Sequence, residues 1–275
     1  MADDDLRASQ LESTSLLRRV ASSLRSFGKL GGTNRGGGEP GFFDQYSRFY
    51  TTSTVGTDKG ERLNERYRAL IKSNEELIRG KTVLDLAAHD GRWSFAALEA
   101  GARHVTSIEV RSYLVENANA SVREYGIEEN RYRFIAGDVF DLFDQLPTDS
   151  IDTVFCFGFF YHTPHHMLLL SKIHRLNPKY LILDTEIDPS TTDPIVRFRK
   201  EKITREANSL MGQPGDPQHA FVGKPSRSAL ETMLTSFGWT FSYYDWHRAG
   251  IKDWHGMRDY RDGRRVSLVA TRGSS

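Results

Sequence analysis

The sequence predicts a doubly wound α/β fold, in which helices cover both faces of a mostly parallel sheet. The first observation is a series of short apolar runs, such as residues 82–87, in which polar and apolar positions do not alternate. Strands of this kind have both faces buried, as in a parallel sheet. The second observation is that helical stretches separate several of these runs, and alternation of strands with helices produces parallel βαβ units.

The apolar runs predict a seven-stranded sheet. The strands are expected at residues 82–87, 104–110, 132–135, 151–157, 180–183, 239–245 and 264–271. Gly263 ends a polar stretch and suits a turn into the last strand, which we expect to pair with its predecessor as an antiparallel hairpin.

Five helices are predicted around these strands, at residues 61–78, 93–100, 112–125, 165–176 and 226–237. Gly80 suits the end of the first helix, because glycine adopts the left-handed conformation common after a helix. Ser226 suits the N-cap of the last helix.

Composition divides the 275 residues into four parts. These are an N-terminal arm with a flexible glycine-rich hinge (1–60), an α/β core (61–188), an inserted lid (189–225) and the remainder of the core sheet (226–275). The strand–helix rhythm stops in the insertion, where a basic helical piece is predicted at residues 195–211. A long insertion in a compact domain is usually a lid or a binding loop.

The arm contains an apolar helical pattern at residues 6–27. We expect this helix to pack on its own protein, although it could instead contact a membrane surface, bind a partner or join copies of the chain into a homo-oligomer.

Charge and cysteine content exclude several function classes. The 37 Lys and Arg against 36 Asp and Glu give a net charge of +1, which argues against nucleic acid as a general partner. The single cysteine, Cys156, forbids an internal disulfide and a multi-cysteine metal site. There is no apolar run of about 18 residues, the length of a membrane span. The acidic N-terminus is unlike a signal peptide, so we expect a cytoplasmic protein.

The most informative segment is residues 82–93, where an apolar strand enters a tight turn that opens a helix. Asp85 lies at the end of this strand, and Glu109 ends the next strand. Parallel strands share their carboxyl edge, where such folds bind ligands, and a carboxylate there can accept hydrogen bonds from ribose hydroxyls. Asp85 and Asp90 disfavour a pyrophosphate and suit a cofactor that carries an ammonium and a sulfonium.

At these residues the chain resembles the class I S-adenosylmethionine (SAM)-dependent methyltransferases, whose first motif is an acid followed by alternating glycines. Asp85 matches the acid, Ala87 and His89 occupy the first two glycine positions, and Gly91 is the third. Two of the three glycines are therefore replaced. Glu109 matches the acid that binds the ribose hydroxyls.

The resemblance extends to two later segments. Asp138 and Val139 match the stretch whose acid meets the adenine amine, and Phe157 begins the segment that lines the substrate side. The resemblance thus implies a Rossmann-like methyltransferase fold and a SAM site. Its residues would be Asp85, Ala87, His89, Asp90, Gly91, Glu109, Asp138, Val139 and Phe157.

A histidine cluster follows the fourth strand, beside the expected point of methyl transfer. Methylation of a hydroxyl oxygen needs a base, and the pKa of histidine suits that task. We predict that His162 is the general base, or failing it His166 or His165. The alternative is that these residues only begin the next helix, with one ring packed against the sheet.

Asp184 and Glu186 end the fifth strand at the same edge. Alternate carboxylates, with His162 nearby, could hold Mg²⁺ against vicinal hydroxyls. The alternative is that they are solvated acids at the start of the lid.

For the methyl acceptor we expect a carbohydrate, as a small molecule or an oligosaccharide. The chain is weakly similar to sugar and polysaccharide O-methyltransferases, such as those that methylate methylmannose polysaccharides. The basic, aromatic segment 195–202 could seat an anionic or hydroxyl-rich substrate, or RNA phosphates. A tRNA-modifying transferase and a non-catalytic SAM-binding scaffold are the alternatives.

Overall fold

The computed structural model of the chain describes residues 40–51, 60–203 and 215–273. Seven strands form one sheet in the order β3-β2-β1-β4-β5-β9-β8. They are β1 (Thr82–Leu86), β2 (His104–Glu109), β3 (Tyr132–Ala136), β4 (Thr153–Phe157), β5 (Tyr180–Glu186), β8 (Trp239–Tyr243) and β9 (Arg265–Arg272). The first five strands are parallel, and β9 is antiparallel to both of its neighbours. The predicted seven-stranded, mostly parallel sheet is confirmed.

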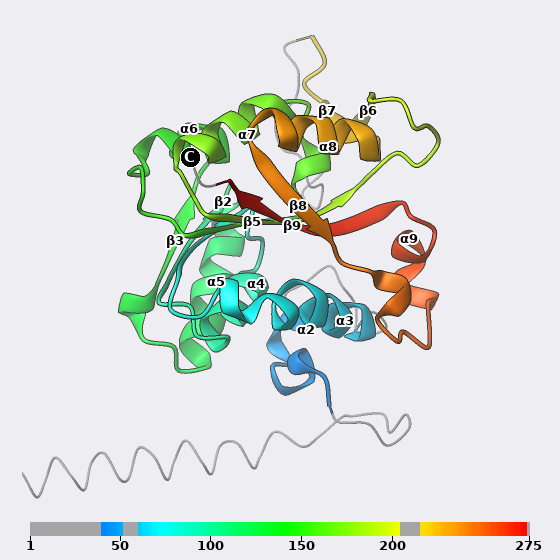
Figure 1. The fold of residues 1–275 in the computed structure, drawn as a ribbon. Coiled ribbons are helices and arrows are strands. Elements are labelled where there is room, and N and C mark those ends of the chain that lie inside the picture. The colour runs from blue at the N-terminus through cyan, green and yellow to red at the C-terminus, as the bar shows by residue number, and fades with distance from the viewer. Residues whose placement is uncertain (1–39, 52–59, 204–214, 274–275) are drawn as a thin grey trace, which may run out of the picture.

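Helices cover both faces of this sheet (Figure 1). One layer contains α3 (Gly60–Leu70), α4 (Arg92–Glu99) and α5 (Ser112–Glu124), and the other contains α6 (Val139–Leu142), α7 (His166–Arg175) and α8 (Arg227–Ser236). Strand β4 explains the need for two layers, since Val154 and Cys156 belong to one apolar cluster and Phe155 and Phe157 to the other. Ser226 caps α8 as predicted, because its hydroxyl accepts a hydrogen bond from the Ala229 amide.

Shorter helices complete the described chain. They are α2 (Arg48–Thr51), α9 (Arg258–Arg261) and the 3₁₀ turns η1 (Phe42–Gln45), η3 (Lys72–Leu77), η4 (Glu129–Arg131), η5 (Phe143–Gln145), η6 (Phe160–His162), η7 (Trp246–Arg248) and η8 (His255–Met257). Several of them lie between β8 and β9. The predicted antiparallel pairing of these two strands is confirmed, but a long connection joins them.

The helix predicted at residues 61–78 is interrupted. Helix α3 ends at Leu70, and a 3₁₀ segment follows in which Asn74 leaves the helical region (φ −119°, ψ 19°). The Asn74 amide group donates to the carbonyls of Ala69 and Leu70 at 3.0 and 3.1 Å. These bonds compete with the helical ladder, which is why an asparagine inside a helical pattern can end the helix.

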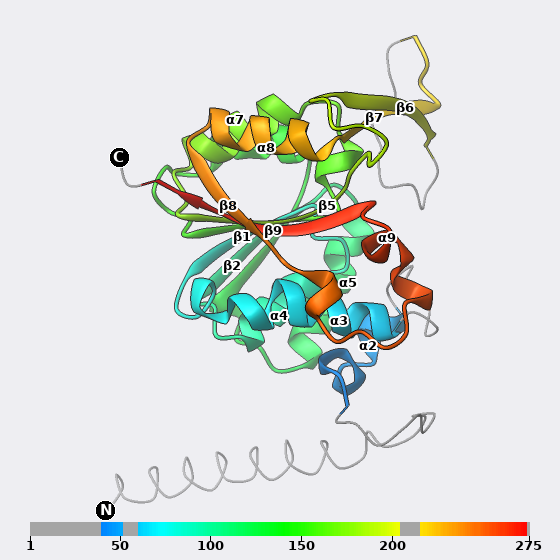
Figure 2. The same cartoon turned by 45° about the vertical axis from the view of Figure 1, so that its right-hand side comes forward.

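The helix predicted at residues 195–211 is wrong where the structure describes it. Strand β6 (Val196–Lys202) pairs antiparallel with β7 (His219–Pro225), and this β6–β7 hairpin projects beyond α8 on the side of α9 (Figure 2). Val196 and Phe198 alternate with arginines, a period of two that indicates a strand. Residues 204–211 of the predicted helix lie outside the described residues.

The arm helix at residues 6–27 and the hinge up to residue 39 also lie outside the described residues. The segment that follows packs on the core, where Phe43 and Phe49 are fully buried in one apolar cluster with Phe95 of α4. Among the helices of the described ranges, none has the length and apolar character that crossing a membrane requires.

Candidate functional site

The turn between β1 and α4 adopts a left-handed backbone at all three positions where the motif has glycine. Ala87, His89 and Gly91 have φ angles of 53°, 55° and 76°. Only the third requires glycine on steric grounds, since a Cβ at Gly91 would lie 2.7 Å from the Ala118 Cβ and 2.9 Å from the Phe134 ring. The turn therefore keeps the motif's backbone, although non-glycine residues in this region cost about 1–2 kcal/mol each.

Asp85 lies beneath this turn and is only 1% exposed. Its carboxylate accepts a hydrogen bond of 2.6 Å from the Ser94 hydroxyl, which lies 2.9 Å from the Ser107 hydroxyl. Burial raises the pKa of Asp85 to about 7, and the negative charge of Glu109 adds to this shift. Asp85 thus links β1 to α4 through the hydrogen bond from Ser94. A direct contact between Asp85 and the cofactor stays a prediction.

Glu109 ends β2 next to the turn. Its Oε2 accepts the His89 amide at 3.0 Å, and its Oε1 accepts the Arg111 amide at 3.1 Å and the Arg111 guanidinium at 3.3 Å. The Arg111 Nη2 is buried and has no hydrogen-bond partner within the described chain. The structure thus brings together the acid and the turn that the sequence singles out, and it adds Arg111, for which the sequence carries no signal.

Asp90 is completely buried in the turn. Although burial opposes its ionisation, the Arg92 guanidinium, whose Nε lies 2.7 Å away, holds the pKa of this carboxyl below its usual range. The negative charge of Asp90, one of the two acids predicted to favour a cationic cofactor, is therefore balanced by Arg92.

The remaining cofactor candidates lie at the same edge of the sheet. Asp138 follows β3 and caps α6, where its carboxylate accepts the Phe140 amide at 2.7 Å, and Val139 is buried as the first residue of that helix. Phe157 ends β4 and packs edge-on against Trp93, at 5.7 Å between ring centroids. Their contacts with a cofactor stay predictions.

The three histidines after β4 lie in different surroundings. The His162 Nδ1 is 3.2 Å from the Glu201 carboxylate on β6, and the His162 side chain is 9% exposed. The buried His166 forms a 3.0 Å hydrogen bond from Nε2 to the carbonyl of Gly223 on β7, and burial lowers its pKa to about 4. His165 is exposed, with its ring edge-on to Phe140. Two of the three histidines thus connect the β6–β7 hairpin to the core.

Asp184, a predicted metal ligand, is instead the anion of a buried cluster. Its Oδ1 accepts hydrogen bonds from Arg66 at 2.9 Å and from the Arg265 Nε at 2.7 Å. Its Oδ2 accepts the hydroxyls of Tyr260 and Ser267, both at 2.7 Å. These two arginines supply the positive charge that a cation would supply, so the structure does not support the prediction that Asp184 holds Mg²⁺.

The second predicted metal ligand, Glu186, forms an ion pair with Lys224. No group of three or more His, Cys, Asp or Glu side chains among residues 40–51, 60–203 and 215–273 has a metal-binding arrangement. The prediction of a magnesium site at Asp184 and Glu186 is therefore not supported.

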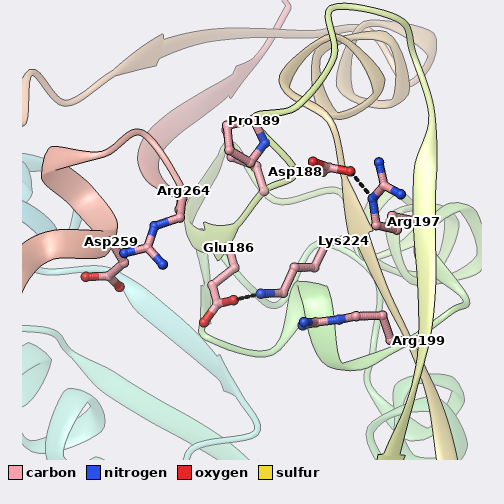
Figure 3. A pocket seen from close by; sticks show the side chains of 9 residues that line it. Glu186, Asp188, Pro189, Arg197, Arg199, Lys224, Asp259 and Arg264 are labelled. Carbon is pink, nitrogen blue, oxygen red and sulfur yellow. Dashed lines mark hydrogen bonds and ion pairs between the residues drawn. The ribbon is translucent and has the colours of Figure 1, made fainter.

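A cavity of about 230 Å³ lies between the β6–β7 hairpin, the end of β5 and the start of β9 (Figure 3). Charged side chains dominate its wall. The lining residues are Glu186, Ile187, Asp188, Pro189, Arg197, Arg199, Lys224, Asp259 and Arg264.

Residues 83–178 match the family model described as "Methyltransferase domain". This segment is a methyltransferase domain. The match spans the β1–α4 turn, Glu109, Asp138 and the histidine cluster, so the predicted resemblance to the class I SAM-dependent methyltransferases is confirmed.

Two curated proteins are similar to parts of this chain. The chain is 30% identical over 82 residues to the ribosomal RNA large subunit methyltransferase I of Pseudoalteromonas translucida, a match that covers 29% of this chain and 21% of that protein. It is 31% identical over 113 residues to the protein arginine N-methyltransferase 1 of Chlamydomonas reinhardtii, with coverages of 41% and 31%. The chain thus spans less than a third of the length of either relative.

Among solved structures, the N-terminal domain of EvdMO1 with bound S-adenosylhomocysteine (SAH) has a similar fold. The TM-score is 0.57 at 18% identity, over 80% of this chain and 86% of that one. The same domain is also known in the presence of SAH and D-fucose. At this identity the comparison establishes the shared fold.

Proposed function

We propose that the chain is a methyltransferase that uses SAM, with Glu109 binding the ribose hydroxyls. The observation that carries the proposal is the contact between Glu109 and the left-handed β1–α4 turn, through the His89 amide. A carboxylate can accept about four hydrogen bonds, and three are recorded for Glu109. The remaining capacity of this carboxylate suits a ribose hydroxyl.

Calorimetric titration of SAM and SAH tests this proposal. We expect Glu109→Ala to weaken both ligands about tenfold or more, since a hydrogen bond to a charged group contributes about 1.5–3 kcal/mol. Glu116→Ala is the matched control, because Glu116 is exposed on α5. If neither ligand binds the wild-type protein, or if the two variants behave alike, the proposal is wrong.

We further propose that the acceptor is a hydroxyl group and that His162 takes its proton. When bound, SAM supplies an electrophilic methyl group and leaves as SAH. The Glu201 carboxylate near Nδ1 favours the tautomer that carries hydrogen on Nδ1 and the lone pair on Nε2. Glu201 would then orient the ring and stabilise the imidazolium, as the carboxylate does in a catalytic triad.

This assignment is tested with the variants His162→Ala and His165→Ala, which remove neighbouring histidines in different surroundings. SAH production is measured over a panel of sugar acceptors that starts with D-fucose, the sugar named for the EvdMO1 structure. We expect His162→Ala to lose about 100-fold or more in turnover with unchanged SAM binding. Full turnover of His162→Ala would remove His162 from the role of base.

A carbohydrate is the acceptor class we propose, because charged side chains line the cavity at the β6–β7 hairpin, and Glu201 of the same hairpin reaches His162. The second candidate is an RNA, which one observation favours: the segment similarity to a ribosomal RNA methyltransferase. Salt-dependent retention of tRNA would support the second candidate. SAM binding without turnover on either class would support a non-catalytic scaffold.

A further inference from the structure

The β6–β7 hairpin carries a row of charged side chains on one of its faces. Successive residues of a strand point to opposite faces, so Arg197, Arg199 and Glu201 share one face of β6. Lys224 lies directly across from Arg197 in the antiparallel register, which places it on the same face. Glu201 reaches His162 from this face and Arg197 reaches Asp188, so Arg199 lies between these two contacts.

Three acids line the cavity under this face, and each is already paired. Asp188 pairs with Arg197, and Glu186 pairs with Lys224 (Figure 3). Asp259 pairs at 2.6 Å with Arg62, which does not line the cavity. The cavity therefore contains more positive than negative charge.

Arg199 carries this excess charge. No ion pair joins Arg199 to an acid within the described parts of the chain. Its side chain points into the cavity, toward the pair formed by Lys224 and Glu186 (Figure 3). Arg264 also lines the cavity, and its one ion pair within the described part of the chain is with the exposed Asp262, at 3.3 Å. The Arg199 guanidinium, with Arg264 as a second cation in the same cavity, is suited to bind an anionic oxygen group.

The cavity also adjoins the proposed site of methyl transfer. The Tyr161 ring, next to His162 in the chain, lies 5.8 Å from the Lys224 ammonium and 5.5 Å from the buried Arg265 guanidinium. Arg199 and Glu201 are two residues apart, which is about 7 Å along a strand. A ligand held by Arg199 can therefore place a hydroxyl group near His162.

We infer that the acceptor carries an anionic group, a phosphate or a carboxylate, near the hydroxyl that is methylated, and that Arg199 binds this group. This inference rests on the proposed function and narrows its substrate class to acidic or phosphorylated hydroxyl compounds. A cavity of about 230 Å³ is below the range of about 300–1,000 Å³ usual for whole ligands. It suits one charged group with the sugar ring extending toward His162.

The test uses probes that share one scaffold and differ at a single carbon: glucose, glucose 6-phosphate and glucuronate. Each is titrated calorimetrically into the full-length protein saturated with SAH. We expect one or both charged probes to bind about tenfold or more tightly than glucose, and Arg199→Ala to remove this difference. Glucose 6-phosphate and glucuronate distinguish a phosphate from a carboxylate.

Lys200→Ala is the matched control, since Lys200 is the next residue on the opposite face and pairs with Asp216. It removes the same charge and is expected to leave the binding of the probes unchanged. Equal binding of all three probes, no binding of either charged probe, or equal effects of the two variants would overturn the inference.

Failure of the inference about Arg199 can be distinguished from failure of the proposed function. If SAH binds and Glu109→Ala abolishes its binding, the SAM site stands whatever the sugar probes do. If SAH does not bind, the proposed function fails, and a charged probe held by Arg199 without SAH would then identify an anion site of another kind.

Discussion

Replacing Asp184 by asparagine should be among the most destabilising single changes in this chain. The Asp184 side chain is fully buried, and its negative charge is in direct contact with two arginines of the cluster, Arg66 and Arg265. Their side chains are 11% and 6% exposed, so water cannot replace the lost carboxylate. An amide in its place keeps the shape but leaves Arg66 without the anion it contacts, and leaves Arg265 with only the more distant Glu186 carboxylate, at 3.9 Å.

The magnitude follows from the cost of a broken buried ion pair, about 3–5 kcal/mol. The folded state holds the pKa of Asp184 below its usual range, mainly through Arg265 and Arg66 against the effect of burial. A depressed carboxyl pKa adds stability above the unfolded-state pKa, so this contribution is fully present at neutral pH. At pH 7 we expect Asp184→Asn to lose about 3–5 kcal/mol of unfolding free energy.

Urea unfolding at pH 7 measures this loss, with the exposed Asp141→Asn as the matched control. Adding Arg265→Met to Asp184→Asn should restore at least about 1 kcal/mol relative to the sum of the single changes, because it removes one of the stranded cations. A loss below about 1 kcal/mol, the range of an exposed pair, would refute this account of the cluster.

Two further predictions concern the turn and the hairpin. Gly91→Ala should lower the free energy of unfolding by about 3 kcal/mol, because it combines a strained left-handed backbone with a clash against Ala118 and Phe134. His89→Gly should instead raise the free energy of unfolding, by up to about 1 kcal/mol, because glycine adopts the left-handed backbone of this position without strain. The folded-state pKa of His166, about 4, lies below its unfolded value of 6.5, so the unfolded state binds its proton first as pH falls. Stability should therefore fall between pH 6.5 and pH 4, by about 2–3 kcal/mol at pH 4.5 relative to His166→Gln.

Thermal or urea unfolding of each variant checks these signs. A Gly91→Ala protein as stable as the wild type would contradict the steric account of the turn. For His166 the informative quantity is the difference in unfolding free energy between the wild type and His166→Gln at each pH. Asp85, whose folded-state pKa is raised to about 7, shifts wild-type stability in the opposite direction, favouring the folded state as pH falls. An identical pH dependence in both proteins would refute the burial of a neutral His166.

The fold could be predicted from the sequence because its signals are local. An apolar run with both faces buried, a serine before a helix and an acid at a strand end are all read within a few residues. The predicted strands, the Ser226 cap and the approach of Glu109 to the β1–α4 turn all appear in the structure. Their positions follow once parallel strands share one carboxyl edge.

What only the tertiary structure decided depends on residues far apart in the chain. The side chains that surround Asp184 come from distant parts of the chain: Arg66, Tyr260 and Arg265 lie 118, 76 and 81 residues away. No local sequence pattern predicts that they contact Asp184. The same holds for Glu201 beside His162, 39 residues away, and for the pairing of β6 with β7. A carboxylate at a strand end has the same sequence signature whether it meets a metal, a ribose or two arginines, because the pairing of charges depends on which distant segments pack against it.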